Sequence, residues 1–258
     1  MHIRRLLLLA GLLTALPCTA GEQIIPFVTY YDYAPFHSID GSSDLTHELA
    51  ALLTRESGGR YRFVPALLPK KRIDNMLQHQ HWQGIVAWSS PRFFYDERKV
   101  NYLWTDALLQ ESALVISHID APVDFKGIAS LRGKVLGTVL NQRYVEVEDM
   151  IANKQLRRSD APSMESNVRK LLLKRVDVVF ISRSAMEGLR QRLPGFESQL
   201  YIAARPRDQF TRHLMLTRGL PPEVISYVQR MTAQLDHNAA WRDILVRQQV
   251  DGLVPPRR

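Results

Sequence analysis

The segment WSSPRFFYDERKVNYLW, residues 88–104, brings two serines and two arginines close together. These are Ser89, Ser90, Arg92 and Arg98, and they follow a short apolar run, GIVA, that predicts a strand. Hydroxyl and guanidinium groups at the end of a strand could donate hydrogen bonds to a ligand, because open α/β sheets bind ligands there. The same residues also fit an ordinary surface loop whose aromatic side chains enter the core.

A second group of cations lies in the segment LPKKR, in which Pro69 fits the first turn of a helix. Lys70, Lys71 and Arg72 would then stand at the helix start, where positive charge opposes the helix dipole. Because this placement is locally unfavourable, Arg72 could instead face a cleft and hold an anionic group.

Catalytic motifs are absent from the sequence. The 8 histidines are scattered, and the only close pair, His79 and His81, is expected at the surface, as is His213. No Ser/His/Asp arrangement, HExxH motif or phosphate-binding loop occurs. We therefore expect no enzyme activity, no cofactor and no metal site.

The N-terminus has the features of a secretory signal peptide: basic residues at Arg4 and Arg5, an apolar run over residues 6–16, and small residues before Gly21. The run is too short to span a bilayer, which takes roughly 20 residues. Cleavage is expected after Ala20, so residues 1–20 would be removed. A lipid anchor on Cys18 is the alternative, although the preceding residues fit that pattern poorly.

Cys18 is the only cysteine, so the exported chain would contain no disulfide and no thiolate chemistry. The formal net charge of +8 is spread along the chain. A basic excess often indicates nucleic acid binding, but an exported protein seldom meets nucleic acid. Steering of small anionic ligands or attraction to an anionic cell envelope accounts for the charge equally well.

Apolar periodicity predicts strands that alternate with helices, which indicates parallel sheets. Strands are expected over residues 24–31, 61–64, 84–88, 112–117, 131–139, 176–182, 200–204 and 214–219. Helices are expected over residues 45–53, after 69, near 144, over 164–173, 224–235 and 241–245. Extended segments near residues 108–117 and 199–206 separate two groups of these elements. Two crossings of this kind predict a hinged, two-lobed α/β protein with a ligand cleft between the lobes.

Four segments together resemble the bacterial extracytoplasmic solute-binding proteins of family 3, which include the polar amino acid receptors of ABC transporters. They are TYYDYAPFHSIDG, DERKVNYLWTDAL, LRGKVLGTVLNQRY and LLLKRVDVVFIS, and the resemblance spans essentially the whole exported chain. It implies the type II periplasmic-binding-protein fold, in which two crossover strands join two α/β lobes. Residues 21–110 and 205–258 would form lobe 1, and residues 111–204 would form lobe 2.

The resemblance also implies a carboxylate clamp in lobe 1. Family members carry an arginine six residues before an aromatic residue, and Arg98 has this spacing to Trp104. A guanidinium suits a carboxylate because it gives two parallel hydrogen bonds. Tyr95 stands where a threonine is expected, however, and the loop after Ser90 is longer than in the family. Arg92 is therefore a competing clamp, and both arginines could be surface charges.

On lobe 2, the family's ligand-binding turn corresponds to Asn141, Gln142 and Arg143, at a helix start that would attract anions. The family also places a carboxylate after the strand VDVVF to bind the ligand's ammonium group. This chain has Ile181 and Ser182 there, which puts recognition of an ordinary α-amino acid in doubt. Glu111 or Glu48 could supply the acid from elsewhere.

Aromatic side chains match the apolar wall that family members stack on the ligand. Tyr31, Tyr33 and Phe36 come from TYYDYAPF, and Trp88 could add a further wall. A tyrosine-rich strand end is also common in a core.

The sequence thus predicts a monomeric, periplasmic solute-binding protein that captures a small polar or anionic molecule, with no nucleic acid partner. Its partner would be an ABC permease. One alternative is a sensing module that docks on a membrane receptor. Another is a dehydratase-like enzyme on the same scaffold.

Overall fold

The computed structural model describes residues 21–38, 41–78, 82–140, 142, 144–190 and 192–255. The predicted signal peptide and the pair His79 and His81 lie outside these residues. The strands are β1 (Gln23–Thr29), β2 (Tyr61–Leu67), β3 (Ile85–Ser89), β4 (Leu103–Trp104), β5 (Leu109–His118), β6 (Val135–Val139), β7 (Arg157–Ala161), β8 (Val178–Ser182), β9 (Leu200–Ile202) and β10 (Asp208–Leu216). The helices are α1 (Leu45–Glu56), α2 (Lys70–Gln78), α3 (Val145–Ala152), α4 (Met164–Leu172), α5 (Arg183–Arg190), α6 (Pro222–Ala233) and α7 (Ala239–Arg247).

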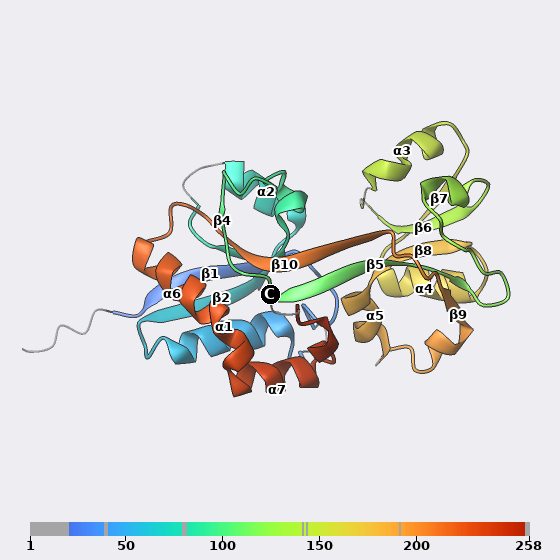
Figure 1. Ribbon diagram of the computed structural model, residues 1–258. Helices are drawn as coiled ribbons and strands as arrows, with labels where there is room; N and C mark the ends of the chain where they lie inside the picture. The colour runs from blue at the N-terminus through green and yellow to red at the C-terminus, as the bar shows by residue number, and fades with distance from the viewer. Residues whose placement is uncertain are drawn as a thin grey trace, which may run out of the picture.

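The strands form two groups, which the long strands β5 and β10 connect, as Figure 1 shows. The first group contains β1, β2 and β3, and the second group contains β6, β7 and β8. The hydrogen-bonded order is β2-β1-β3-β10-β5-β8-β6-β7, and β4 and β9 pair at the sides with β10 and β5. Strands β1, β2 and β3 are parallel to one another, as are β6, β7 and β8. The antiparallel pairing of β5 with β10, from Leu109 to Ala113, lies between the two groups.

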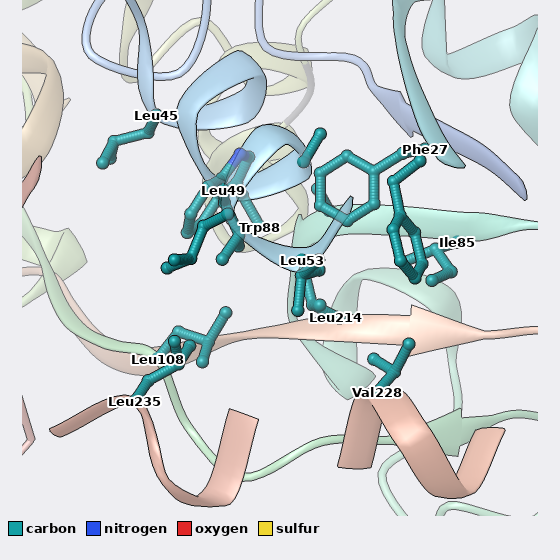
Figure 2. Packing of buried hydrophobic residues seen from close by; sticks show 14 of the residues in the cluster. Phe27, Leu45, Leu49, Leu53, Ile85, Trp88, Leu108, Leu214, Val228 and Leu235 are labelled. Carbon is teal, nitrogen blue, oxygen red and sulfur yellow. The ribbon is translucent and has the colours of Figure 1, made fainter. Parts of the chain in front are cut away.

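Helix α1 covers the first group because its apolar residues recur on one face. Its start is capped by Asp44, whose Oδ1 accepts a hydrogen bond from the backbone N–H of His47 at 2.8 Å. The buried face belongs to one core cluster with side chains of β1, β3, β10, α6 and α7 (Figure 2). The labelled side chains in this core include Phe27, Leu49 and Trp88.

The second group has a helix layer on each face of its sheet. Successive side chains of β8 point to opposite faces of the sheet. Val179 and Ile181 pack on the face that α4 covers, and Val178 and Phe180 pack on the face that α3 covers. A strand that is buried on both faces reads as a continuous apolar run, which is how VDVVFIS appears in the sequence.

Most of the predicted elements are present, with shifted ends. The second crossing was expected near residues 199–206, but the strand that runs from one group to the other is β10, over Asp208–Leu216. Residues 200–202 form β9, which pairs with the far end of β5 instead. Strand β7 and helix α5 were not predicted, since neither RRSDA nor RSAMEGLR shows a long apolar repeat. Within the described residues, no helix is long and apolar enough to cross a membrane.

Candidate functional site

A buried ion pair lies where β5 and β10 pass between the two groups. Arg212 Nε donates to Glu111 Oε2 at 3.0 Å, and the two side chains are 1% and 0% exposed. Glu111 also accepts hydrogen bonds from the backbone N–H of Ser184 at 3.2 Å and from its hydroxyl at 2.5 Å. Arg212 Nη1 donates to the carbonyl of Trp88 at 3.1 Å. Strands β3, β5 and β10 and helix α5 therefore meet at one charge pair.

Aromatic rings surround the Arg212 guanidinium. Its Cζ lies 4.5 Å from the ring centroids of Tyr31 and Phe36 and 5.2 Å from that of Phe210. Burial lowers the pKa of Arg212, but Tyr31 and Glu111 outweigh this and leave the pKa above its ordinary value. The side chain is thus a fixed cation that its surroundings already neutralise.

The predicted aromatic wall is largely assembled around this cation. Tyr31 lies 5.6 Å from Tyr33 and 5.1 Å from Phe36 between ring centroids. Burial raises the pKa of Tyr33, so its phenol stays neutral and can donate or accept a hydrogen bond. Phe36 and Trp88 are both 0% exposed, and Trp88 donates from Nε1 to Thr46 Oγ1 at 2.9 Å. These two rings are core residues in this conformation and offer no surface to a ligand.

The loop over residues 88–104 is organised by one carboxylate. Asp96 Oδ1 accepts backbone hydrogen bonds from Val100 and Asn101, both at 2.8 Å, and Oδ2 accepts from Tyr102 N at 3.1 Å and Trp104 Nε1 at 2.9 Å. Burial alone would raise the pKa of Asp96, but these donors outweigh it and lower the pKa. The outer part of this loop is therefore folded around the Asp96 carboxylate.

The two serines of this loop lie at its buried start. Ser89 ends β3 and is 0% exposed, and its Oγ has no hydrogen-bond partner among the described residues. Ser90 precedes the short 3-10 helix η1 (Pro91–Phe94) and is also buried. The unpartnered hydroxyl of Ser89 is a free donor and acceptor inside the protein.

The three candidate arginines are not brought together. Arg92 Nη1 pairs with Asp208 Oδ2 at 2.5 Å, which ties the predicted loop to the start of β10. Arg98 is exposed in the outer part of the loop. Arg72 is exposed on α2. Of the two competing clamps, only Arg92 lies beside a connecting strand.

The lobe 2 candidates are only partly described. Asn141 and Arg143 lie outside the described residues, and Gln142 is exposed. Ser182 ends β8, where its Oγ lies 3.2 Å from Ser184 Oγ, next to the Glu111 centre.

Sequence reasoning missed Arg207, which precedes β10. Its guanidinium lies 4.9 Å from the ring centroid of Tyr144 and 5.1 Å from that of Phe180, and it pairs with Glu146 of α3. Burial lowers the pKa of Arg207 and raises that of Tyr144 to about 12.

The expectation for His213 was wrong, since this histidine is 6% exposed and its Nδ1 lies 2.9 Å from the Thr105 carbonyl.

A cavity of about 370 Å³ lies between the two groups. One wall comes from the segment between Ala34 and Glu48 and from the residues that follow α7, and the other comes from α5 and Arg192. Among the predicted ligand residues that the structure describes, only Glu48, one of the two alternative acids, lines it. Its lining residues are Ala34, Pro35, His37, Ser38, Ser42, Ser43, Asp44, Glu48, Glu187, Gly188, Arg192, Arg247, Gln248 and Gln249.

Both acids that could have replaced the missing carboxylate already have cationic partners. Glu111 holds Arg212, as described above. Glu48 borders the cavity and pairs with Arg247, and hydrogen bonds from Ser43, Arg247 and Gln248 lower its pKa against the opposing effect of burial. A ligand ammonium group would therefore have to share or displace an existing partner.

No family model matches the chain, and no curated protein matches its sequence. Several solved structures share its fold. One, described with glutathione import via GshT and the cystine ABC importer TcyBC of Streptococcus mutans, has a TM-score of 0.70 and 14% identity and covers 91% of this chain and 98% of that one. An ancestral arginine-binding protein bound to arginine has a TM-score of 0.65 and 14% identity, with coverage of 88% and 98%. The unliganded, open L-cystine solute receptor of Neisseria gonorrhoeae has a TM-score of 0.58 and 14% identity, with coverage of 91% and 96%.

These likenesses define the class of fold. The chain has the type II periplasmic-binding-protein fold, as the family resemblance predicted. Its structural neighbours are solute-binding proteins, several of them named for amino acids, in agreement with the resemblance to family 3.

Proposed function

We propose that the protein is a periplasmic solute-binding protein that captures a small polar or anionic molecule, amino acid-like or a carboxylate, and presents it to an ABC-type permease. The observation that carries this proposal is the cavity of about 370 Å³ with one wall from each group of elements. Cavities of this size suit molecules as large as an amino acid. The fold and the predicted signal peptide agree with such a role.

The working step would be closure of the two lobes about β5 and β10. The proposal takes the predicted lobes, residues 21–110 with 205–258 and residues 111–204, as the two moving parts. The pairing of β5 with β10, antiparallel from Asp208 to Arg212, supports a connection of this kind. A two-stranded connection can twist while the sheets on either side stay packed. Non-catalytic binding fits the absence of any catalytic motif in the sequence.

The solute would be recognised by both acidic and basic side chains. Glu48 and Glu187 border the cavity together with Arg192 and Arg247. On opening, Tyr31, Tyr33 and the Ser89 hydroxyl could become accessible beside Arg212, which would provide an aromatic and hydroxyl surface for the same ligand.

A thermal-shift screen tests this proposal. The protein would be titrated with amino acids, opines, polyamines, small carboxylates and peptidoglycan fragments, because a ligand that binds only the folded state raises its stability by RT ln(1 + [L]/Kd), about 2.7 kcal/mol at a hundredfold excess over Kd. We expect one class to raise the Tm.

Three variants would then locate the binding site. Arg192→Ala should reduce the shift if the solute occupies the cavity, whereas Arg92→Ala should reduce it if the solute binds at the predicted loop. Arg230→Ala, at an exposed position of α6, is the matched control. If no class of solute raises the Tm, the small-solute receptor is rejected.

A further inference from the structure

Two imidazoles and a carboxylate meet at the start of α1. His37, Asp44 and His47 each offer one ligand atom, and these three atoms lie within 4.8 Å of one another. His37 lies in the loop after β1, Asp44 is the N-cap of α1, and His47 lies in its first turn. No sequence pattern indicates this cluster, because the three residues follow no familiar metal-binding spacing.

The contact of His47 with Asp44 is a direct hydrogen bond, whereas the contact of His37 with Asp44 is wider. His37 Nδ1 lies 3.7 Å from Asp44 Oδ2, which is too long for a hydrogen bond. His47 Nδ1 lies 2.9 Å from the same oxygen. Two ligand atoms on one tetrahedral zinc ion, each about 2.1 Å from it, would lie about 3.4 Å apart. The three atoms lie within 4.8 Å of one another, so side-chain shifts of up to about 1.4 Å would bring all of them onto one ion.

The Asp44 carboxylate is already oriented by the backbone. Its Oδ2 accepts a hydrogen bond from Ser38 N at 3.0 Å, and its Oδ1 accepts one from His47 N at 2.8 Å. A carboxylate has about four acceptor positions, so lone pairs remain for a cation. Hydrogen bonds of this kind hold metal ligands in position in known sites.

Burial and position also suit a metal site. The Asp44 side chain is 3% exposed, while those of His37 and His47 are 21% and 53% exposed, so the cluster can be reached from solvent. His37 and Asp44 also line the cavity between the two groups. Water or another donor in this cavity could fill the fourth position of a tetrahedral ion.

We propose that His37, Asp44 and His47 bind one divalent transition-metal ion, and that zinc is the ion of best fit. Two imidazoles with one carboxylate favour zinc, copper or nickel over calcium or magnesium, which prefer oxygen ligands. Helix capping accounts for Asp44 and for the contact of His47. It does not account for His37, which lies beyond hydrogen-bonding distance of the cap.

The test is isothermal titration with Zn²⁺ of protein purified without a histidine tag, followed by measurement of bound metal after dialysis. We expect one Zn²⁺ per chain. His37→Ala and His47→Ala should each weaken binding by more than about tenfold. His237→Ala, which removes an exposed histidine outside the cluster, should leave the affinity unchanged.

Asp44→Asn separates metal binding from capping. Asparagine is as good an N-cap as aspartate, so the fold should persist, as judged by circular dichroism, while zinc binding is lost. The proposal is overturned if the wild type binds no zinc at one equivalent. It is also overturned if the folded His37→Ala, His47→Ala and Asp44→Asn variants all bind zinc as the wild type does, because the ion then lies elsewhere.

Discussion

Arg212 Nε and Glu111 Oε2 lie 3.0 Å apart on neighbouring strands, at the only part of β5 and β10 where these two strands pair with each other. The backbone carbonyl of Trp88 in β3 and both donors of Ser184 in α5 complete this centre. This charge pair therefore has one partner in β3, in the first group of elements, and one in α5, which packs on the second group. It couples the packing of the two groups.

Breaking this pair should be costly. Glu111→Gln leaves the Arg212 charge buried without a counter-ion, so we expect the free energy of unfolding to fall by about 3–5 kcal/mol. The double variant Glu111→Leu/Arg212→Met removes both charges and should recover much of this loss. Urea unfolding of Glu111→Leu, Arg212→Met and the double variant gives the coupling energy, and strictly additive effects would contradict a coupled pair.

Gly188 should control how closely the two groups approach. A Cβ atom at this position of α5 would overlap the carbonyl group of Ala34, which belongs to the other wall of the cavity. We expect Gly188→Ala to separate the walls and to increase the radius of gyration in X-ray scattering. Alanine also favours a helix over glycine by about 1 kcal/mol, so the Tm should not fall.

Gly252→Ala is the matched control for Gly188→Ala, because a Cβ at Gly252 meets no atom within 4 Å. If Gly188→Ala lowers the Tm and leaves the radius of gyration unchanged, the contact is a rigid part of the fold and the proposed separation is wrong.

Asp96 should stabilise the loop over residues 88–104 through its charge. In Asp96→Asn, the amide group faces N–H donors, and each orphaned donor costs about 1–3 kcal/mol. Because the pKa of Asp96 is lowered by folding, its contribution is present above the unfolded value of about 3.9 and is lost as the pH falls through the folded value.

The measurement for Asp96 is the free energy of unfolding as a function of pH. The wild type should lose stability more steeply than Asp96→Asn below pH ~4. Parallel curves for the two proteins would show that this carboxylate carries no such contribution.

His213 should make stability depend on pH near neutrality. Burial lowers its pKa more than its hydrogen bond to the Thr105 carbonyl raises it. The unfolded chain therefore binds a proton more readily, and stability should be lost as the pH falls below the unfolded value of about 6.5 and on toward the lower folded value. His213→Gln should flatten the stability curve over this window in chemical denaturation, and an unchanged slope would assign the dependence to other groups.

Local patterns in the sequence predicted most of the fold. The apolar run of VDVVFIS marks β8 because both of its faces are buried. Helix α5 escaped prediction because its eight residues, RSAMEGLR, offer few apolar positions, and Ser184 and Ala185 are buried through contacts with distant segments.

The candidate site was harder to predict because its contacts join distant segments. No local pattern links Glu111 to Arg212, although both become fully buried. Arg98 was chosen by its spacing to Trp104, but Asp96 folds the intervening loop upon itself and leaves Arg98 exposed. Tyr31 and Tyr33 were named because the resemblance places an aromatic wall there. The structure packs the two rings 5.6 Å apart, with the Tyr31 ring 4.5 Å from the Arg212 guanidinium, and their contact with a ligand stays a prediction.

The strand order has a consequence for how the fold is completed during synthesis. Strand β3 needs β10 as its neighbour, and Trp88 stacks on Trp241 of α7 with 6.5 Å between ring centroids. Elements β6 to β8, by contrast, find their partners within a continuous stretch of chain. The group that begins first along the chain is thus the last to be completed. Until α6 and α7 are added, the part of its apolar core that these two helices cover stays exposed.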